Sequence, residues 1–292
     1  VRFSRNLTYI SSYIFFHCSE LVSIIIPNNI TKIYDSAFRQ CSSLKYVFIA
    51  DTVTEINSYA FDTNCRVAIV FYAGTYEPIL GDSPFDSHFN IKVPIEYNSS
   101  SLDKITVNKT LKYNELTDKI VWMFDTLNCD LTILGFGEIP DYSSPSETPW
   151  SSYITSIKTV YIDSGITSIG NNSFSSCINL QSLKFGNYVK RIGSFAFHNC
   201  ANLRGLLELP KTVTSIGESA FAGTNLENVT FYGENEPNCP NAFNLIGSKP
   251  SSSLIATVIG NYTGTSLCGI QLNKGNDDVS NSEESILPTP TL

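Results

Sequence analysis

Three histidines and eight cysteines are the residues of this 292-residue chain best suited to metal binding or nucleophilic chemistry. His17 precedes Cys18 directly, whereas His198 lies two places before Cys200, and no C-x-x-C pair is present. Zinc ribbons and thioredoxin-like redox sites are therefore not supported. The H-E-x-x-H, G-x-S-x-G and P-loop motifs are missing, and the stretch "GFGEIP" lacks the last glycine of a dinucleotide-binding loop. We predict no catalytic residue, no metal site and no cofactor.

The carboxylates are scattered except in the last stretch of the chain, residues 271–292. There Asp277 and Asp278 are followed by Glu283 and Glu284, in a polar segment that ends in prolines. Such carboxylates could bind Ca²⁺ weakly, but the composition favours a solvated, disordered tail.

Charge and hydropathy exclude two classes of protein. The net charge is −8 and charged residues make up only 16% of the chain, so no basic face for nucleic acid is expected. No apolar run reaches the length of about 18 residues that spans a membrane. Apolar residues nevertheless make up 42%, enough for a folded protein with a substantial core.

A repeat of 23 residues organises the first part of the chain. The dipeptide Ala-Phe recurs at that interval, and apolar residues and cysteines keep the same phase from one unit to the next. The in-phase sets are Ile10, Ile33 and Ile56; Phe15, Phe38 and Phe61; Cys18 and Cys41; and Leu21, Leu44 and Val67.

The same pattern returns in the second part, with one extra residue in "LRGLLELP". Its in-phase sets are Ile169, Ile192 and Ile216; Phe174, Phe197 and Phe221; Cys177 and Cys200; and Leu180, Leu203 and Leu226. A fixed period in this range indicates supersecondary units that stack on one another.

The spacing L-x-x-I-x-I inside each unit is typical of the strand of a leucine-rich repeat. We expect a mainly β solenoid with coils of about 23 residues, each coil one strand spacing, roughly 5 Å, from the next. The in-phase phenylalanines are predicted to stack inside the core, and the in-phase cysteines to be buried reduced thiols.

Two matching closures predict two tandem modules. "FYAGTYEPILGDSPF" and "FYGENEPNCPNAF" share Phe-Tyr, Gly, Glu-Pro and a terminal Phe, and a short strand and a Tyr follow each. Because the ends of a solenoid expose apolar surface, such segments are expected to cap them. We predict a first module over 1–98, a linker over 99–118 and a second module over 119–270. An opening segment, with Trp122, Phe124 and Trp150, is expected to cover the first coil of the second module.

The segments "GITSIGNNSFSSCINLQSLKFG" and "TVTSIGESAFAGTNLENVTFYG" resemble the BspA-like leucine-rich repeat family. The first module is less regular, since Tyr34 and Asn57 stand where that family carries Gly. The resemblance implies a non-enzymatic, surface-exposed or secreted protein that binds host matrix or cell-surface proteins, and binding of a glycan is a further option. The alternative is an intracellular leucine-rich repeat scaffold for a protein partner.

One column of residues on the outer face of the first module is apolar. Ile25, Phe48 and Phe71 occupy one phase, and Tyr46 lies beside them. If this face is exposed, the four residues form a protein-binding patch. The alternative is that the face packs on the linker, on the second module, or across a sandwich-like solenoid. The matching column of the second module is polar: Tyr161, Lys184, Glu208 and Thr230.

Two further features depend on whether the protein is exported from the cell. Cys239 and Cys268 both fall in the second closure, where a disulfide would pin the final loop of an exported protein. Seven asparagines begin N-x-S/T sequons, which we list as candidate glycosylation sites: Asn6, Asn29, Asn98, Asn108, Asn171, Asn228 and Asn261.

Overall fold

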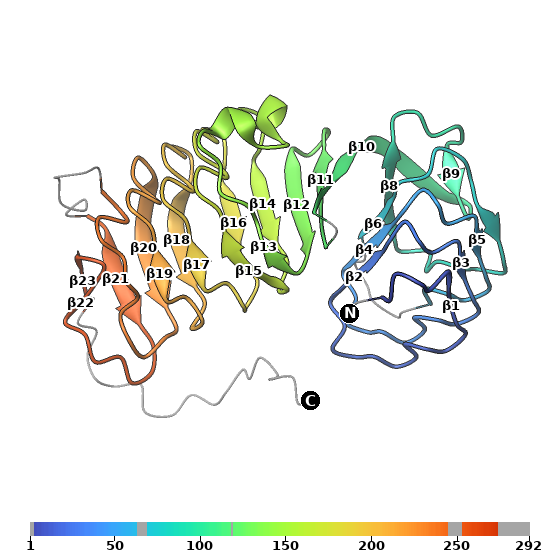
Figure 1. The fold of residues 1–292 in the computed structure, drawn as a ribbon, viewed down its shortest axis with the longest axis horizontal. Coiled ribbons are helices and arrows are strands. Elements are labelled where there is room, and N and C mark those ends of the chain that lie inside the picture. Colours follow the sequence, from blue (N-terminus) through green and yellow to red (C-terminus); the bar gives the residue numbers. More distant parts are fainter. Residues whose placement is uncertain (1–2, 63–68, 118, 245–252, 274–292) are drawn as a thin grey trace.

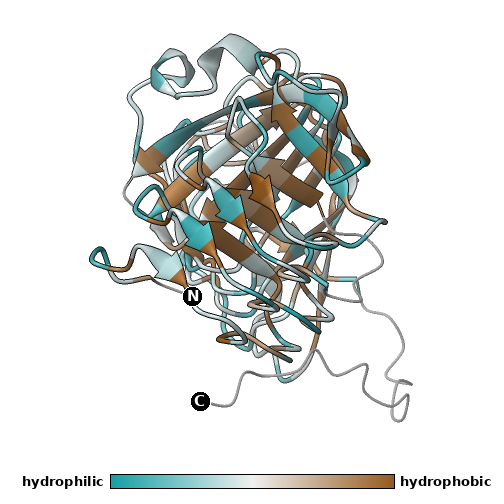
Figure 2. Ribbon diagram, turned by 90° about the vertical axis from the view of Figure 1, so that its right-hand side faces the viewer, coloured by the Kyte–Doolittle hydropathy of each residue, from teal (hydrophilic) through white to brown (hydrophobic). Residues whose placement is uncertain are grey.

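The computed structural model describes residues 3–62, 69–117, 119–244 and 253–273 of the chain. It is the predicted β-solenoid, in which the coils stack strand on strand along one side and shorter strands form a narrow sheet on the opposite side of each module (Figure 1). On the first side a ten-stranded sheet is followed by a three-stranded one. Apolar residues gather in the strands, and polar residues are frequent in the turns between them (Figure 2). The stack therefore buries its core between the two sheets, as a repeat of this length requires.

The first module contains four coils. Its long-sheet strands are all parallel: β2 (Ser23–Ile26), β4 (Tyr46–Ile49), β6 (Ile69–Tyr72) and β8 (Asn90–Pro94). Its narrow sheet is formed by β1 (Tyr9–Ile10), β3 (Lys32–Ile33), β5 (Glu55–Ile56) and β7 (Ile79–Leu80).

The second module repeats this arrangement. The strands equivalent to those of the first module's long sheet are β12 (Asp130–Gly135), β14 (Thr159–Ile162), β16 (Ser182–Lys184), β18 (Arg204–Leu209), β20 (Asn225–Phe231) and β21 (Ile255–Val258). The narrow sheet contains β13 (Gly137–Glu138), β15 (Ile166–Ile169), β17 (Arg191–Ile192) and β19 (Ser215–Ile216). Two short 3-10 helices, η1 (Pro145–Glu147) and η2 (Ser151–Tyr153), precede its first full repeat.

The stretch expected as a linker is itself part of the sheet. It holds β9 (Ser101–Leu102) and the thirteen-residue β10 (Ile105–Thr117), which lies parallel to β8 and antiparallel to β11 (Ile120–Asp125). Since β11 also pairs antiparallel with β12, one long sheet continues from the first module into the second. The connection is consequently a hydrogen-bonded strand rather than a loop (Figure 1).

Stacked aromatic rings form the centre of each module. In the first, Phe15, Phe38, Phe61 and Phe85 follow one another with ring centroids 4.9 to 5.5 Å apart. In the second, the column is Trp150, Phe174, Phe197, Phe221 and Phe243, with spacings of 5.1 to 5.4 Å. Trp150 therefore closes the first coil, in the role expected of the opening segment, and its indole N–H donates to Ser173 O at 2.8 Å.

The predicted reduced thiols lie beside these rings. Cys41, Cys177 and Cys200 are buried and free, whereas Cys18 is free but only half-buried. The thiols of Cys41 and Cys200 donate to the carbonyls of Phe15 and Phe174, at 3.1 and 3.2 Å. Each thiol thus bonds to the preceding coil, which is consistent with a structural role.

The two closing segments share a structure as well as a sequence pattern. Tyr97 and Tyr262 each donate their hydroxyl to the carbonyl four residues later, and a two-residue turn then follows in each. The turns join β9 to β10 and, at the other end, β22 (Ser266–Leu267) to β23 (Ile270–Gln271), both antiparallel. The β9–β10 hairpin extends the first closing segment past residue 98, the end predicted from the sequence.

The glutamate of each Glu-Pro pair holds its hairpin in place. Glu77 accepts a hydrogen bond from Asp103 N–H at 3.3 Å, and Glu236 accepts one from Cys268 N–H at 2.6 Å. The carboxylate therefore satisfies a backbone donor at a tight turn, where the chain has no strand partner for it.

Most of the predicted tail, residues 274–292, lies outside the described residues. Its first three residues do not belong to a tail. Gln271 is in β23, and Asn273 N–H donates to Ala256 O at 2.8 Å.

Candidate functional site: the interface and groove between the modules

The four residues of the predicted patch lie together but are not an open surface. The strand registers align Ile25 with Phe48 and Phe48 with Phe71, as the repeat predicted. However, Phe48 is only 4% exposed and Phe71 only 2%. Ile25 and Tyr46 are half-buried. The expectation that this face is exposed is therefore wrong, and the structure has the alternative, in which the face packs on the linker stretch and on the second module.

The covering side chains come from the connecting hairpin. Val121 and Met123 of β11, Leu134 of β12 and Leu111 of β10 form one buried cluster with Phe48 and Phe71. Rings meet across the junction: Phe48 lies 5.7 Å from Tyr113, and Tyr46 stacks on Tyr161 at 4.3 Å. The sheet curls so that the outer face of the first module meets the outer face of the strands that open the second.

A signal for this packing exists in the sequence. The segment "IVWMFD" of β11 is apolar on both faces, and all six residues are buried. Trp122 and Phe124 enter the core of the second module, whereas Val121 and Met123 enter the inter-module cluster. A strand with no polar face is typical of burial on both sides, and this indicates that the hairpin must be covered.

A buried ion pair joins the modules at this interface. Lys92 of β8 and Asp125 of β11 form a salt bridge with their side chains 4% and 2% exposed. Asn128 and the backbone N–H of Leu127 also donate to the Asp125 carboxylate, at 2.8 and 3.1 Å. Burial alone would raise the pKa of Asp125. The hydrogen bond and charge of Lys92, with the Leu127 N–H, outweigh it and hold that pKa below its usual range.

A second polar contact ties β2 to the second module. The hydroxyl of Ser23 donates to the carboxylate of Asp163, 2.8 and 2.9 Å from its two oxygens. The N–H groups of Gly135 and Ser164 donate to the same carboxylate. Burial raises the pKa of Asp163, and these hydrogen bonds offset part of the rise.

A groove of about 1130 Å³ lies beside this contact. One wall is β2 with the residues that flank it, and the other is formed by the second module, including Lys119, Gly135, Gly165 and Tyr188. Ile25 and Phe48 line it, so half of the predicted patch borders open space even though its centre is buried. The groove is the concave site that the two modules build together.

Among the described residues, the outer face of the second module is open over β18, β20 and β21 at several positions. Its exposed residues include Leu206 and Glu208 on β18, Asn228 on β20 and Ile255 on β21. The register places Leu206, Asn228 and Ile255 in one row across three strands. Of the polar column predicted here, Lys184 and Glu208 are exposed, Thr230 is buried and Tyr161 stacks on Tyr46.

The sequon asparagines differ in accessibility. Five are exposed: Asn6, Asn98, Asn108, Asn228 and Asn261. Asn29 and Asn171 are half-buried. The amide nitrogen of Asn29 donates to the carbonyls of Ser4 and Leu7, so a glycan there would displace at least one of these bonds.

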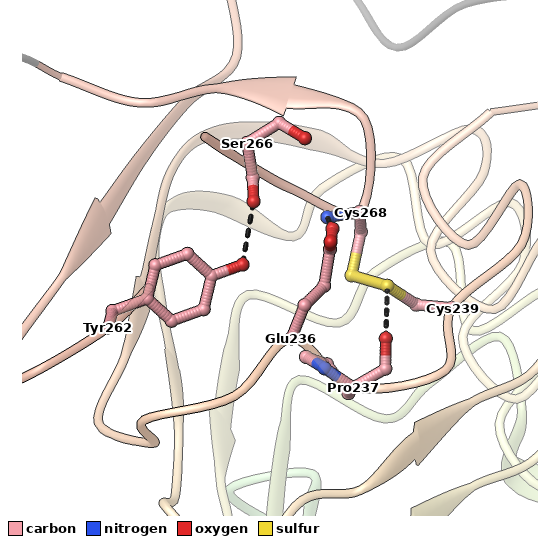
Figure 3. Close-up of a disulfide and its surroundings, with 6 residues drawn as sticks. All are labelled: Glu236, Pro237, Cys239, Tyr262, Ser266 and Cys268. Carbon is pink, nitrogen blue, oxygen red and sulfur yellow. Dashed lines mark hydrogen bonds between the residues drawn. A yellow bond between two sulfur atoms is a disulfide. The ribbon is translucent and has the colours of Figure 1, made fainter. Parts of the chain in front are cut away.

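The structure joins Cys239 and Cys268 in a disulfide (Figure 3). The bridge ties the loop after Pro237 to the turn of the β22–β23 hairpin, next to the Glu236 carboxylate that accepts from Cys268 N–H. In the first closing segment the equivalent positions are Leu80 and Asp103, so its hairpin is held without a covalent bond.

Replacing Cys239 and Cys268 together by serine is expected to destabilise the second closing segment. The bridge closes a loop of 29 residues, which corresponds to about 3–4 kcal/mol of unfolding free energy. Urea denaturation of the double variant measures the loss. Cys129→Ser, at a free half-buried cysteine, is the control and should change little. An unchanged midpoint in the double variant would show that the bridge constrains nothing.

The described residues contain no group of three or more His, Cys, Asp or Glu that could hold a metal ion. Within the same residues no helix has the length and apolarity needed to cross a membrane. The three histidines do not converge: His88 pairs with Asp86 at 2.7 Å, and His17 and His198 lie in different modules.

None of the curated proteins matches the chain. Solved structures similar to it include three bacterial proteins. A leucine-rich repeat protein from Eubacterium ventriosum is 24% identical over 52% of this chain and 45% of its own, with a TM-score of 0.37. One from Bacteroides ovatus is 17% identical over 91% and 64%, with a TM-score of 0.31. A leucine rich cell surface protein from Faecalibacterium prausnitzii is 18% identical over 92% and 87%, with a TM-score of 0.34.

The chain spans less than two thirds of the length of the first two of these proteins. The family model described as the BspA type leucine rich repeat region matches in six copies, over residues 1–92 and 151–249. These residues are more than half of the chain, and they are the coils whose in-phase rings and strands are described above. The chain belongs to the BspA-type leucine-rich repeat family.

Proposed function

We propose that the chain is a non-enzymatic recognition protein of the cell surface or the extracellular space, which binds a host matrix or cell-surface protein. The observation that carries this proposal is the set of exposed side chains that the described residues present on the outer face of β18, β20 and β21. The equivalent face of the first module is buried within the chain, whereas Leu206 is 56% exposed and Ile255 40% exposed. Leu206 and Ile255 lie on either side of Asn228 in the row, and exposed apolar side chains bordered by polar ones are typical of a protein interface.

The neighbouring side chains give this face its specificity. Tyr232 donates to Glu208 at 2.8 Å, which holds a carboxylate beside Leu206. Lys184 adds a positive charge on the strand two coils before β20. A partner surface would present apolar groups to Leu206 and Ile255 and opposite charges to Glu208 and Lys184.

The disulfide supports the extracellular location, because such bonds persist in oxidising compartments. Counting thiols in denatured native material separates the two locations. Export predicts one bridge and six free thiols among the eight cysteines, whereas the intracellular scaffold predicts eight free thiols.

Binding to a panel of purified matrix proteins and intact epithelial cells tests the function. Leu206→Glu should weaken saturable binding by about tenfold or more, because it replaces one of the two exposed apolar residues of the row with a charge. Leu127→Glu is the matched control, since Leu127 is 68% exposed on the turn between β11 and β12. Asn228 must be unmodified in the test protein, since a glycan would cover the row. Equal binding by both variants would place the interface elsewhere, and no binding by the wild type would contradict the function.

A further inference from the structure

The strands on the long-sheet side of the second module are not paired throughout. β16 pairs with β14 over three residues, and β18 pairs with β20 over six. β16 and β18 are neighbours in the stack (Figure 1), but β16 ends the ten-stranded sheet and β18 begins the three-stranded one. Among the described residues, the long-sheet side is therefore interrupted between these two coils.

The extra residue in "LRGLLELP" accounts for the interruption. The core residues Leu203 and Leu207 are four places apart, whereas the equivalent Leu226 and Val229 of the next coil are three apart. Gly205 takes up the additional residue with a φ of +71°, a conformation that glycine adopts without strain. Pairing with β20 continues past a register shift at this glycine. Because an extra residue bends a strand and disrupts its ladder, the pairing with β16 is lost.

The core is partly uncovered at the same place. Leu183 and Phe185 of the β16 coil pack on the core but are only half-buried. Val160 and Ile162, the equivalent residues of the coil before, are 0% exposed. The β16 and β18 coils therefore cover each other less completely on the long-sheet side than coils whose strands are paired.

The opposite side of this coil boundary is intact. β15 and β17 pair in the narrow sheet, and Gly193 N–H donates to Ile169 O at 2.8 Å. In the adjoining turns, Phe174 N–H donates to Ala196 O at 2.8 Å. The rings of Phe174 and Phe197 stack at 5.1 Å. The two coils are thus joined on one side and unpaired on the other, which is the geometry of a hinge.

We propose that the boundary between the β16 and β18 coils is a hinge. It opens on the long-sheet side and pivots on the narrow sheet and the adjoining turns. The strands β18, β20 and β21 are paired with one another, so they move as one unit. Such a local opening has a lower free energy than global unfolding, because it breaks no strand pairing and few apolar contacts.

The hinge passes through the surface proposed to bind a partner. Lys184 lies before it on β16, whereas Leu206 and Glu208 lie after it on β18. A partner that contacts both sides would span the hinge and hold it closed. This consequence rests on the proposed function, but the hinge itself does not.

A buried thiol reports the opening. The Cys200 thiol is 0% exposed and donates across the boundary to Phe174 O at 3.2 Å. Cys41 of the first module is its match, since it is also 0% exposed and donates to Phe15 O of the preceding coil at 3.1 Å. The difference is that the strands of the coils joined by Cys41, β2 and β4, are paired over four residues. Opening of the hinge should therefore expose Cys200 and leave Cys41 buried.

The test is labelling of the complete native chain with N-ethylmaleimide, followed by peptide mass spectrometry that measures the rate at each cysteine. We expect Cys200 to react about tenfold faster than Cys41 or more, because only Cys200 is exposed by a local opening. Deletion of Gly205 returns the core residues to three-residue spacing and should restore the pairing of β16 with β18. In this variant the Cys200 rate should fall about tenfold or more, and the Cys41 rate should stay unchanged.

Two results would overturn the proposal. Equal rates at Cys200 and Cys41 in the wild type would show that no hinge opens between β16 and β18. A Cys200 rate that the deletion leaves unchanged, in a variant whose circular dichroism matches the wild type, would place the opening elsewhere. If the deletion variant does not fold, the comparison of the two thiols in the wild type still decides.

The hinge and the proposed function fail separately, because the labelling uses the chain alone. Equal thiol rates, in a chain whose binding is lost in Leu206→Glu, would remove the hinge and leave the function. Faster labelling of Cys200, in a chain that binds no matrix protein or cell, would remove the function and leave the hinge. If a matrix protein binds, slower labelling of Cys200 in its presence would show that it spans the hinge, and an unchanged rate would show that it contacts one side only.

Discussion

Replacing Lys92 by alanine is expected to lower the unfolding free energy by about 3–5 kcal/mol, because it leaves the Asp125 carboxylate buried without its cation. Both side chains are almost fully buried, and the ammonium also lies 6.0 Å from the centre of the Phe71 ring. Asn128 and Leu127 still donate to the carboxylate in the variant but carry no compensating charge. Urea denaturation followed by tryptophan fluorescence measures the loss, since Trp122 lies on the same strand as Asp125.

Two controls separate the unpaired charge from a general effect of lysine removal. Lys32 forms a 2.8 Å salt bridge with Glu55 on the surface, with side chains 45% and 25% exposed. Lys32→Ala should change the unfolding free energy little, because water screens the pair. The double variant Lys92→Met with Asp125→Leu removes both charges and should recover most of the loss. A large loss in the double variant would show that shape, rather than charge, governs the site.

The ion pair also predicts how stability depends on pH. The folded-state pKa of Asp125 is lowered, so the stabilisation is fully present above its unfolded value of about 3.9. It is lost as the pH falls through the lower folded value. The difference in stability between wild type and Lys92→Ala should therefore shrink as the pH falls, beginning above about pH 4, because burial without Lys92 raises the pKa of Asp125 in the variant.

The coils could be predicted because a solenoid is specified locally. A period of 23 residues places each Phe on the next, and neither the rings nor the strands depend on contacts far along the chain. Trp150 was predictable for the same reason, since it lies within 24 residues of the Phe174 ring that it covers. The shared role of Glu77 and Glu236 is visible only in the structure, where the carboxylate of each accepts a hydrogen bond from a backbone N–H of its hairpin turn.

The packing of the first module's outer face on the second module could not be predicted from the repeat. Tyr46 and Tyr161 stack although they are 115 residues apart in the chain, and Ser23 bonds to Asp163 across 140 residues. Such contacts depend on the direction in which β10 and β11 turn the sheet, and no periodic signal specifies that direction. The apolar column predicted the need for a cover correctly, but an apolar column does not distinguish a partner from another part of the same chain.

Phe48→Glu is expected to separate the two modules. Loss of a buried phenylalanine side chain costs about 3–5 kcal/mol. The new carboxylate would also be buried among Met123, Leu134 and Tyr113, and the nearby Lys92 ammonium is already paired with Asp125. We therefore expect a loss of more than about 5 kcal/mol at the interface, which is exceptional for one substitution. The two solenoid cores are separate clusters and should keep their strands, so circular dichroism should change little.

Small-angle X-ray scattering measures this separation directly, as an increase in the radius of gyration of the variant. Unfolding in urea should change to two steps, because the modules no longer stabilise each other through the shared face. Phe48→Leu is the control, since it stays apolar and should cost about 1.5 kcal/mol or less without opening the interface. If Phe48→Glu instead kept the wild-type stability and radius of gyration, Phe48 would lie on an open face. The first module would then present the binding surface that its sequence suggests.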